Sequence, residues 1–298
     1  MVEVLISAQE LDRRLAAGAA WTEAPASAEA PAPLVLDVRW VLGDPQGHRH
    51  YLARRIPGSV YVDLNADLAA PAEPALGRHP LPDPEDLQAA ARRWGLRRGQ
   101  GVVVLDDNGG LAAARAWWLL RWAGLEDVRL LDGGLRAWTE AGYPVHGEQD
   151  LRPAPEPGDV QLEVGRMPVV DIDAAATLPA HGVLLDARAA ERYRGETEPV
   201  DPRAGHIPGA LNAPTGENLR EDGRFKDVED LRARFAALGA DPEAGAAGEV
   251  AVYCGSGVTA AHEIVALALA GVPAALYPGS WSQWSNDARR PVGTGAEA

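Results

Sequence analysis

The chain has 298 residues, of which 46% are hydrophobic and 24% charged, a composition typical of a globular protein and not of a disordered or fibrous one. A single core stops growing near about 250–300 residues, so two domains are expected. The formal net charge of −15 argues against a nucleic-acid or anionic-membrane partner, because phosphate binding needs clustered Lys and Arg side chains.

The cysteine content and the N-terminal residues bear on the compartment. The single cysteine, Cys254, excludes an intrachain disulfide and any multi-cysteine metal site. No stretch approaches the roughly 18 apolar residues of a membrane span, and residues 1–15 lack a basic region followed by an apolar one. We therefore predict a cytoplasmic protein.

Two halves of the chain share short segments in the same order, at an offset of about 150 residues, which predicts a duplicated unit. The matching pairs are 34–39 with 183–188, 56–59 with 207–210, 102–106 with 250–254, and 132–134 with 278–280.

Each half places a short apolar run of β-forming residues before a longer apolar stretch of helical character. The runs are 102–105 and 250–253, and the stretches are 112–123 and 260–270, the latter ending at Gly271. Continuous apolar strands that alternate with helices are typical of a parallel sheet covered on both faces. We predict an α/β protein of two tandem domains, each a small, mostly parallel sheet with helices on both faces.

The boundary between the domains is indicated by a run of prolines. Residues 150–158 contain Pro153, Pro155 and Pro157, which neither continue a helix nor sit in a central strand. We predict an N-terminal domain at 1–149, a linker at 150–165 and a C-terminal domain at 166–298.

Cys254 lies between a predicted buried strand and a predicted helix. Ligands of open parallel sheets bind outside the carboxyl ends of the strands, where loop amides point outward. Gly255 and Gly257 allow the loop to curl so that its N–H groups face the sulfur and stabilise a thiolate. A lone cysteine is more often a small buried apolar residue, but this strand–loop–helix context favours a nucleophile.

The segments 254–259 (CGSGVT), 205–210 (GHIPGA) and 186–188 (DAR) are similar to those of tandem-domain rhodaneses, in particular the 3-mercaptopyruvate sulfurtransferase branch. The similarity extends over nearly the whole chain. It implies two rhodanese-like domains, an inactive N-terminal one and a catalytic C-terminal one. Asp106 stands where the first domain would need its cysteine, and a carboxylate cannot carry a sulfane sulfur.

The resemblance implies two-step covalent catalysis. Cys254 would take sulfur from a small-molecule donor as a persulfide and pass it to cyanide, a small thiol or thioredoxin. The thiosulfate-preferring branch has basic residues after the cysteine, whereas Gly255 and Ser256 stand here, so 3-mercaptopyruvate is the expected donor. A thiosulfate:cyanide sulfurtransferase is the alternative, and a non-catalytic persulfide carrier is a third hypothesis. The remaining loop residues expected at the donor site are Gly257, Val258 and Thr259.

Further site residues are carried over from the family by position. Ser256 would be linked to His79 and Asp63, which orient and polarise it for proton transfer to or from the donor. Arg192 would bind the donor's carboxylate with its planar fork of donors.

Two more positions complete the expected site. The second family arginine follows a Glu-Pro pair directly, but here Val200 follows that pair, so Arg203 is the candidate for this role. Trp40 matches a tryptophan that lines the family's cleft. Arg188, two residues after Asp186, is interpreted as a structural ion-pair partner.

Phosphate chemistry and cofactors are disfavoured. Phosphatases related to rhodanese end a longer cysteine loop in arginine, and the corresponding residue here is Ala260. The chain has no nucleotide-binding glycine-rich loop and no His/Cys cluster with metal-ligand spacing, so no cofactor or metal is implied.

Overall fold

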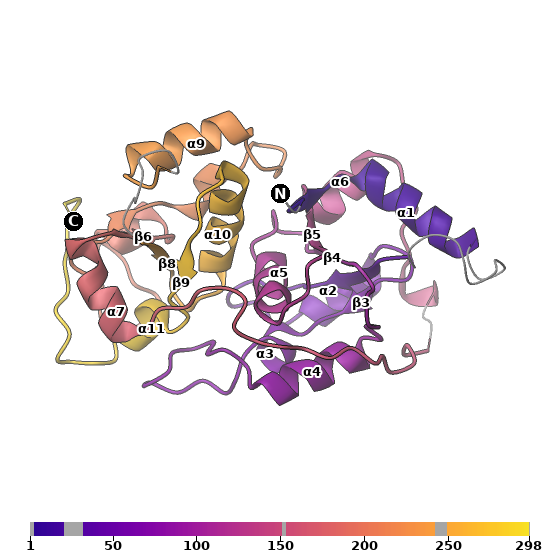
Figure 1. Cartoon of the computed structure of the whole chain (residues 1–298), viewed down its shortest axis with the longest axis horizontal. Coiled ribbons are helices and arrows are strands. Elements are labelled where there is room, and N and C mark those ends of the chain that lie inside the picture. Colours follow the sequence, from indigo (N-terminus) through magenta and orange to yellow (C-terminus); the bar gives the residue numbers. More distant parts are fainter. Residues whose placement is uncertain (1–2, 21–31, 151–152, 242–248, 298) are drawn as a thin grey trace. The chain divides into compact units, whose positions relative to one another are not determined.

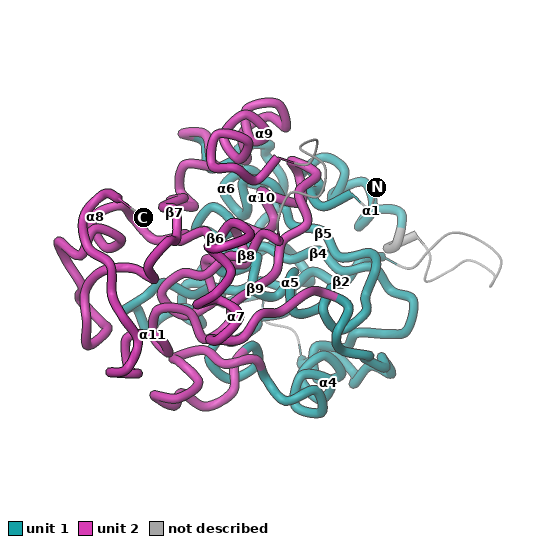
Figure 2. The backbone as a smooth tube through the Cα atoms, turned by 60° about the vertical axis from the view of Figure 1, so that its left-hand side comes forward, with its two compact units in different colours: residues 1–68, 82–166, 222–224 teal, residues 69–81, 167–221, 225–298 magenta. Residues whose placement is uncertain are grey.

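The computed structural model describes residues 3–20, 32–150, 153–241 and 249–297. The chain divides into two compact units, shown in two colours in Figure 2. The first comprises Met1–Leu68, Pro82–Arg166 and Asp222–Arg224, and the second Ala69–Leu81, Met167–Glu221 and Phe225–Ala298. The boundaries at 149 and 166 stay predictions, and residues 151–152 of the expected linker lie outside the described residues.

The first unit contains a five-stranded, wholly parallel sheet in the order β1-β5-β4-β2-β3 (Figure 1). Helices α1 and α6 cover one face of it, and α5 packs against β4 and β5 on the other. The strands are β1 (Leu5–Ile6), β2 (Leu34–Asp37), β3 (Val60–Tyr61), β4 (Val102–Leu105) and β5 (Val128–Leu131). The helices are α1 (Ala8–Ala20), α2 (Gly47–Ala53), α3 (Leu64–Asp67), α4 (Pro84–Arg93), α5 (Ala113–Trp122), α6 (Gly134–Glu140) and the 3₁₀ turn η2 (Glu148–Asp150).

The second unit contains a four-stranded parallel sheet in the order β7-β6-β8-β9. Helices α7 and α11 lie on one face, whereas α10 packs against β8 and β9 and carries α9 on its outer side (Figure 1). The strands are β6 (Val183–Asp186), β7 (Leu211–Asn212), β8 (Val250–Tyr253) and β9 (Ala275–Leu276). The helices are α7 (Ile172–Thr177), η3 (Leu178–Ala180), α8 (Ala190–Tyr193), η4 (Thr215–Asn218), α9 (Val228–Ala237), α10 (Thr259–Ala270) and α11 (Ser280–Trp284).

The predicted central elements are confirmed. Strands β4 and β8 have the predicted bounds and are buried along their whole length, as apolar runs between two helical layers must be. Helix α5 is one residue shorter at each end than expected, and α10 ends at Gly271 in a left-handed C-cap with φ of 85°. The predicted α/β class with parallel sheets is confirmed as well.

The repeat is visible in the strand register. Val183 pairs with Val250 in the second unit as Leu34 pairs with Val102 in the first. The equivalent strands β2 and β6 each end in a buried aspartate that is bound by the arginine two residues later. Asp186 Oδ2 accepts from Arg188 Nη2 at 2.6 Å, which confirms the structural interpretation of Arg188. The equivalent pair in the first unit is Asp37 with Arg39.

Candidate active site

Cys254 directly follows β8 at the carboxyl end of the second sheet, and α10 begins five residues later. The residue is 1% exposed, and its Sγ accepts a hydrogen bond from the Gly257 amide at 3.1 Å. Gly257 has φ of +79°, and a Cβ there would lie 2.6 Å from the carbonyl oxygen of Pro278. Glycine is therefore required for the turn that aims this amide at the sulfur. For the amides of Gly255, Val258 and Thr259, a contact with the sulfur stays a prediction.

The start of α11 holds the backbone of the cysteine loop. Trp281 N donates to the carbonyl of Cys254 at 3.0 Å, and Cys254 N donates to Ser280 Oγ at 3.1 Å. Ser280 is fully buried and adopts φ of 53°, a left-handed conformation that costs a non-glycine residue about 1–3 kcal/mol. Because both backbone groups of Cys254 are bonded to α11, this helix fixes the position of the cysteine.

Ser256 and His79 are brought together, as expected. Ser256 Oγ and His79 Nδ1 lie 2.8 Å apart, and the two residues are only 5% and 8% exposed. A hydroxyl hydrogen-bonded to an imidazole in a buried setting is suited to proton transfer, since the ring accepts or returns the hydroxyl proton.

His79 reaches this position because its segment, residues 69–81, packs within the second unit. Gly77 has φ of +96°, and a Cβ there would lie 2.6 Å from the carbonyl oxygen of Gly279, at the start of α11. Only a glycine allows this close approach, and it precedes His79 by two residues. The hydrogen bonds that anchor the segment to α11 are Arg78 N to Ser282 Oγ at 3.0 Å and Gln283 Nε2 to Ala75 O at 2.7 Å.

Two guanidinium groups lie beside Gly255, the residue after the cysteine. A Cβ built on Gly255 would lie 3.1 Å from Arg78 Nη2 and 3.5 Å from Arg192 Nη1. Arg192 therefore lies next to the cysteine loop, where it was expected. Arg78 was not among the residues predicted from the sequence, although its place directly before His79 was a signal that could have found it.

Two carboxylates hold these arginines. Glu198 accepts from Arg192 Nη2 at 2.7 Å, and Asp201 forms an ion pair with Arg78 Nη1. Burial raises the pKa of Asp201, and the neighbouring Arg78 opposes that rise. Arg78 Nη2 and Arg192 Nη1, the nitrogen atoms nearest Gly255, make no hydrogen bond to any described residue. Two positively charged N–H donors thus remain for an anion next to the cysteine.

Arg203 requires a correction, because its guanidinium is used for a structural purpose. It donates to four backbone carbonyl groups, one at the last residue of α11 and three in the segment that follows, and this leaves little capacity for a donor's carboxylate. The acceptors are Trp284 O, Ser285 O, Asp287 O and Arg290 O, all between 2.7 and 2.8 Å. Arg203 therefore stabilises the segment after α11.

A family model named for the rhodanese-like domain matches the sequence twice, at residues 19–141 and 172–287. The chain belongs to the rhodanese family. The two matches correspond to the two copies of the parallel sheet, so the predicted resemblance and the predicted pair of rhodanese-like domains are confirmed.

Relatives span almost the full length of this rhodanese-family chain. A probable 3-mercaptopyruvate sulfurtransferase of Pseudomonas aeruginosa is 48% identical over 98% of both chains. A putative thiosulfate sulfurtransferase of Mycobacterium tuberculosis is 45% identical over 98% of both. The crystal structure of a 3-mercaptopyruvate sulfurtransferase from Escherichia coli superposes with a TM-score of 0.78 and 30% identity, covering 94% of this chain and 99% of the other. The chain is therefore a sulfurtransferase.

Two predicted site residues of this sulfurtransferase belong to the first unit. Asp63 Oδ1 caps α3, accepting from the amides of Asn65 at 2.9 Å and Ala66 at 3.1 Å. Trp40 is partly buried after Arg39. Their parts in catalysis stay predictions.

In the N-terminal rhodanese-like domain, which has no cysteine, Asp106 occupies the position equivalent to Cys254, and its carboxylate is bound by the surrounding loop. Asp106 directly follows β4, is fully buried, and accepts four backbone N–H bonds. Burial raises the pKa of this carboxyl, and the backbone bonds oppose the rise. The loop after β4 thus directs several backbone amides at the Asp106 carboxylate. The donors are the amides of Asn108, Gly110, Ala112 and Ala113, at 2.8–3.0 Å.

No helix within residues 3–20, 32–150, 153–241 and 249–297 has the length and apolar character needed to cross a membrane. In the same part of the chain, no group of three His, Cys, Asp or Glu side chains is arranged to hold a metal ion.

Proposed function

We propose that the protein transfers sulfur from 3-mercaptopyruvate to a thiol or cyanide through a persulfide on Cys254. The observation that supports this donor is the 2.8 Å hydrogen bond between Ser256 and His79 in the cysteine loop. Release of pyruvate from 3-mercaptopyruvate requires that a proton leave the donor's thiol and that one reach the carbon left behind. Sulfur transfer from thiosulfate requires neither proton, so a buried proton-transfer pair favours the mercaptopyruvate reaction.

In the first step the Cys254 thiolate attacks the donor's sulfur. The new S–S bond forms as the donor's C–S bond breaks, and the electron pair of that C–S bond stays on carbon as the enolate of pyruvate. The proton taken from the donor's thiol balances the proton that the enolate carbon gains. Ser256, polarised by His79, carries this proton, and we assign Asp63 the part of orienting His79.

The donor's carboxylate would bind to Arg192 and Arg78. The two nitrogen atoms nearest Gly255, Arg192 Nη1 and Arg78 Nη2, are not used in the ion pairs, which Arg192 makes through Nη2 and Arg78 through Nη1. Charge-assisted hydrogen bonds from two guanidinium groups fix a carboxylate in position as well as binding it. Arg78 thus takes the role that the sequence had assigned to Arg203.

The persulfide would be stabilised by the loop amides and then consumed by an acceptor. Gly257 already donates to the sulfur, and we assign the same task to the amides of Gly255, Val258 and Thr259. A thiolate acceptor, including that of thioredoxin, attacks the outer sulfur and leaves as a persulfide, whereas cyanide leaves as thiocyanate. Cys254 is returned as the thiolate in both cases.

Two additional assignments follow from this chemistry. We assign Trp40 to the wall of the donor site, where an indole would exclude water from the enolate. A persulfide that turns over with thiol acceptors suits a reducing compartment, so we place the protein in the cytoplasm.

A comparison of donors tests the proposal. The ratio of kcat/KM for 3-mercaptopyruvate to that for thiosulfate should exceed one, and incubation of the intact protein with 3-mercaptopyruvate should add one sulfur atom. The name of the Mycobacterium tuberculosis relative favours thiosulfate:cyanide sulfurtransferase as the second candidate, and a ratio below one would select it. A passive persulfide carrier would gain the sulfur atom but show no rapid turnover with small acceptors.

A further inference from the structure

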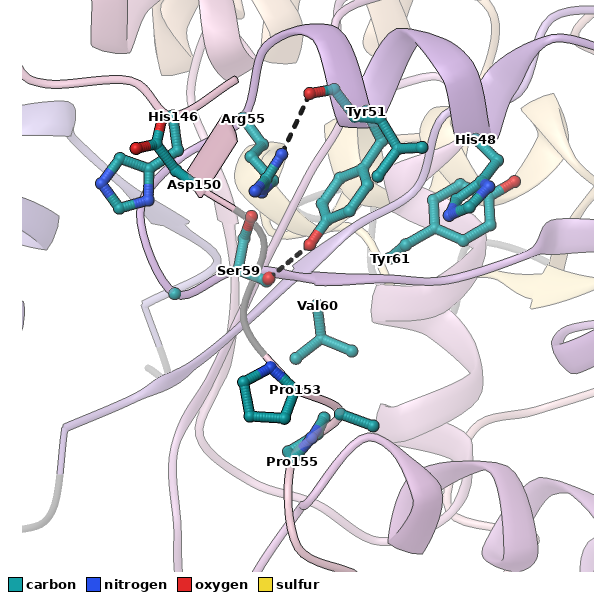
Figure 3. Close-up of a pocket in the computed structure, with 13 residues that line it drawn as sticks. His48, Tyr51, Arg55, Ser59, Val60, Tyr61, His146, Asp150, Pro153 and Pro155 are labelled. Atoms are coloured by element: carbon teal, nitrogen blue, oxygen red, sulfur yellow. Dashed lines mark hydrogen bonds between the residues drawn. The ribbon is translucent and has the colours of Figure 1, made fainter. Parts of the chain in front are cut away.

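A cavity of about 540 Å³ lies in the first unit, beside β3 and the turn that precedes it. Residues of α2 and β3, the turn before β3, and residues 146, 150 and 153–155 line it (Figure 3). All the residues that line it belong to the first unit, whereas Cys254 belongs to the second. Its volume lies within the range of about 300–1,000 Å³ typical of small-molecule pockets.

Arg55 is a buried cation in this cavity. It is 4% exposed, and its Nη1 donates to the carbonyl of Leu52 at 3.0 Å. No carboxylate among the described residues lies within 4.0 Å of its guanidinium, and its Nε and Nη2 make no hydrogen bond to them. Arg55 lines the cavity, so these N–H donors are available to a carboxylate bound there.

The duplicated unit provides an internal comparison at this position. Arg55 corresponds to His206, since both precede an Ile-Pro-Gly segment and both pair through the backbone with a distant residue, His146 or Gly293. His206 stacks on Tyr193 with ring centroids 3.9 Å apart. Arg55 lies over the equivalent ring, that of Tyr51, at 5.3 Å. Both units thus have a tyrosine ring at this position, but in the first unit the group above the ring is the permanently charged guanidinium of Arg55.

His206 in the second unit has no open space beside it, unlike Arg55 in the first. A Cβ built on Gly293 would lie 2.5 Å from His206 Nε2, so the strand partner packs directly on the ring. The first unit has His146 at that place, and its side chain lines the cavity instead. Figure 3 shows the Arg55 guanidinium between the Tyr51 ring and the stretch from His146 to Asp150.

Aromatic and apolar side chains form much of the remaining wall. The rings of Tyr51 and Tyr61 lie 5.5 Å apart, and Val60, Pro153 and Pro155 line the cavity as well. The carboxylate of Asp150 also lines it, and its Oδ2 accepts from Gly147 N at 3.0 Å. A flat ring would find aromatic and proline surfaces here, and a single negative group would find Arg55.

We propose that this cavity is a binding site for a small organic anion, an aromatic carboxylate whose carboxyl group pairs with Arg55. The ring of the ligand packs among Tyr51, Tyr61 and the two prolines. The site is separate from sulfur transfer and does not rest on the choice of donor.

Crystals of the full chain soaked with 4-bromobenzoate test the proposal directly, because the anomalous signal of bromine locates the ring. The expected result is a bromine peak in this cavity with the carboxylate on Arg55. A carboxylate found only at other positions, or no bromine at all, would overturn the proposal. This measurement uses the unaltered chain and therefore does not depend on the folding of any variant.

Calorimetric titration supplies the affinity and its origin. It uses chains that carry both Arg78→Gln and Arg192→Gln, so that the proposed donor site does not contribute. Arg55→Gln should weaken 4-bromobenzoate binding by about 10-fold or more, whereas Arg49→Gln, at an exposed arginine of α2, should leave it unchanged. The neutral 4-bromobenzamide should bind about 10-fold more weakly than the carboxylate. If Arg55→Gln does not fold, Arg55→His introduces the residue of the other unit. Equal affinity in the Arg55 variant, or equal binding of the amide, contradicts the proposal.

Discussion

His79 Nδ1 lies 2.8 Å from Ser256 Oγ, although 177 residues separate the two in the chain. The hydrogen bond joins a segment from the first half of the sequence to the cysteine loop of the second half, and both residues are almost fully buried. Ser256 follows Cys254 by two residues, so this bond places a proton acceptor beside the cysteine loop.

The first prediction concerns the nucleophile. Cys254→Ser should reduce turnover by at least about 10³-fold with any donor, because an alcohol at this position does not form a persulfide. Intact-mass measurement after incubation with 3-mercaptopyruvate should show no added sulfur atom. Normal turnover in this variant would disprove the covalent mechanism.

The second prediction concerns the proton-transfer pair. Ser256→Ala and His79→Gln should each lower kcat/KM for 3-mercaptopyruvate by about 10²-fold and that for thiosulfate by much less. The physical reason is that only the first donor needs a proton moved as its C–S bond breaks. His181→Gln, an exposed histidine of the same unit, serves as the control and should change neither value. Equal losses with both donors would remove the pair from the chemical step.

The third prediction concerns the space beside the cysteine. Gly255→Ala places a Cβ 3.1 Å from Arg78 Nη2 and 3.5 Å from Arg192 Nη1, where the donor's carboxylate is proposed to bind. We expect KM for 3-mercaptopyruvate to rise by about 10-fold, with a smaller change in kcat. Gly216→Ala is the matched control in the same unit, because a Cβ there meets no atom within 4 Å. An unchanged KM would place the carboxylate elsewhere.

The fourth prediction separates two arginines that the sequence alone does not distinguish. Arg78→Gln should raise KM for 3-mercaptopyruvate by about 10-fold, through the loss of a charge-assisted hydrogen bond. Arg203→Gln should instead lower the free energy of unfolding by about 2 kcal/mol or more, because carbonyl groups after α11 lose their donors. Urea denaturation together with steady-state kinetics checks both. A large KM effect in the Arg203 variant at unchanged stability would reverse the assignment.

The fifth prediction concerns the unit without a cysteine. Asp106→Ala leaves four buried N–H groups without their acceptor and should lower the free energy of unfolding by about 3 kcal/mol or more. Asp106→Asn keeps an acceptor oxygen of similar size and should cost less. The measurement is the urea midpoint of each variant, and a midpoint equal to that of the unaltered chain for Asp106→Ala would show that the loop does not depend on this carboxylate.

The amino-acid sequence by itself determined the features that depend on neighbouring residues. The apolar runs of β4 and β8, the helix stop at Gly271 and the place of Cys254 after a strand all follow from local periodicity and from glycine and proline preferences. The internal repeat added the duplicated sheet, because similar segments in the same order fold alike.

Tertiary structure decided which distant side chains meet. Arg203 could not be told from a donor-binding residue by its spacing, because the carbonyl groups it binds come from a segment more than eighty residues away. Arg78 reaches the cysteine loop only because Gly77 lets its segment approach α11 closely. The contrast between Arg55 and His206 was visible in the repeat, but its meaning depended on the burial of the charge and the cavity beside it. Burial and long-range packing are properties of the whole fold, and no local pattern encodes them.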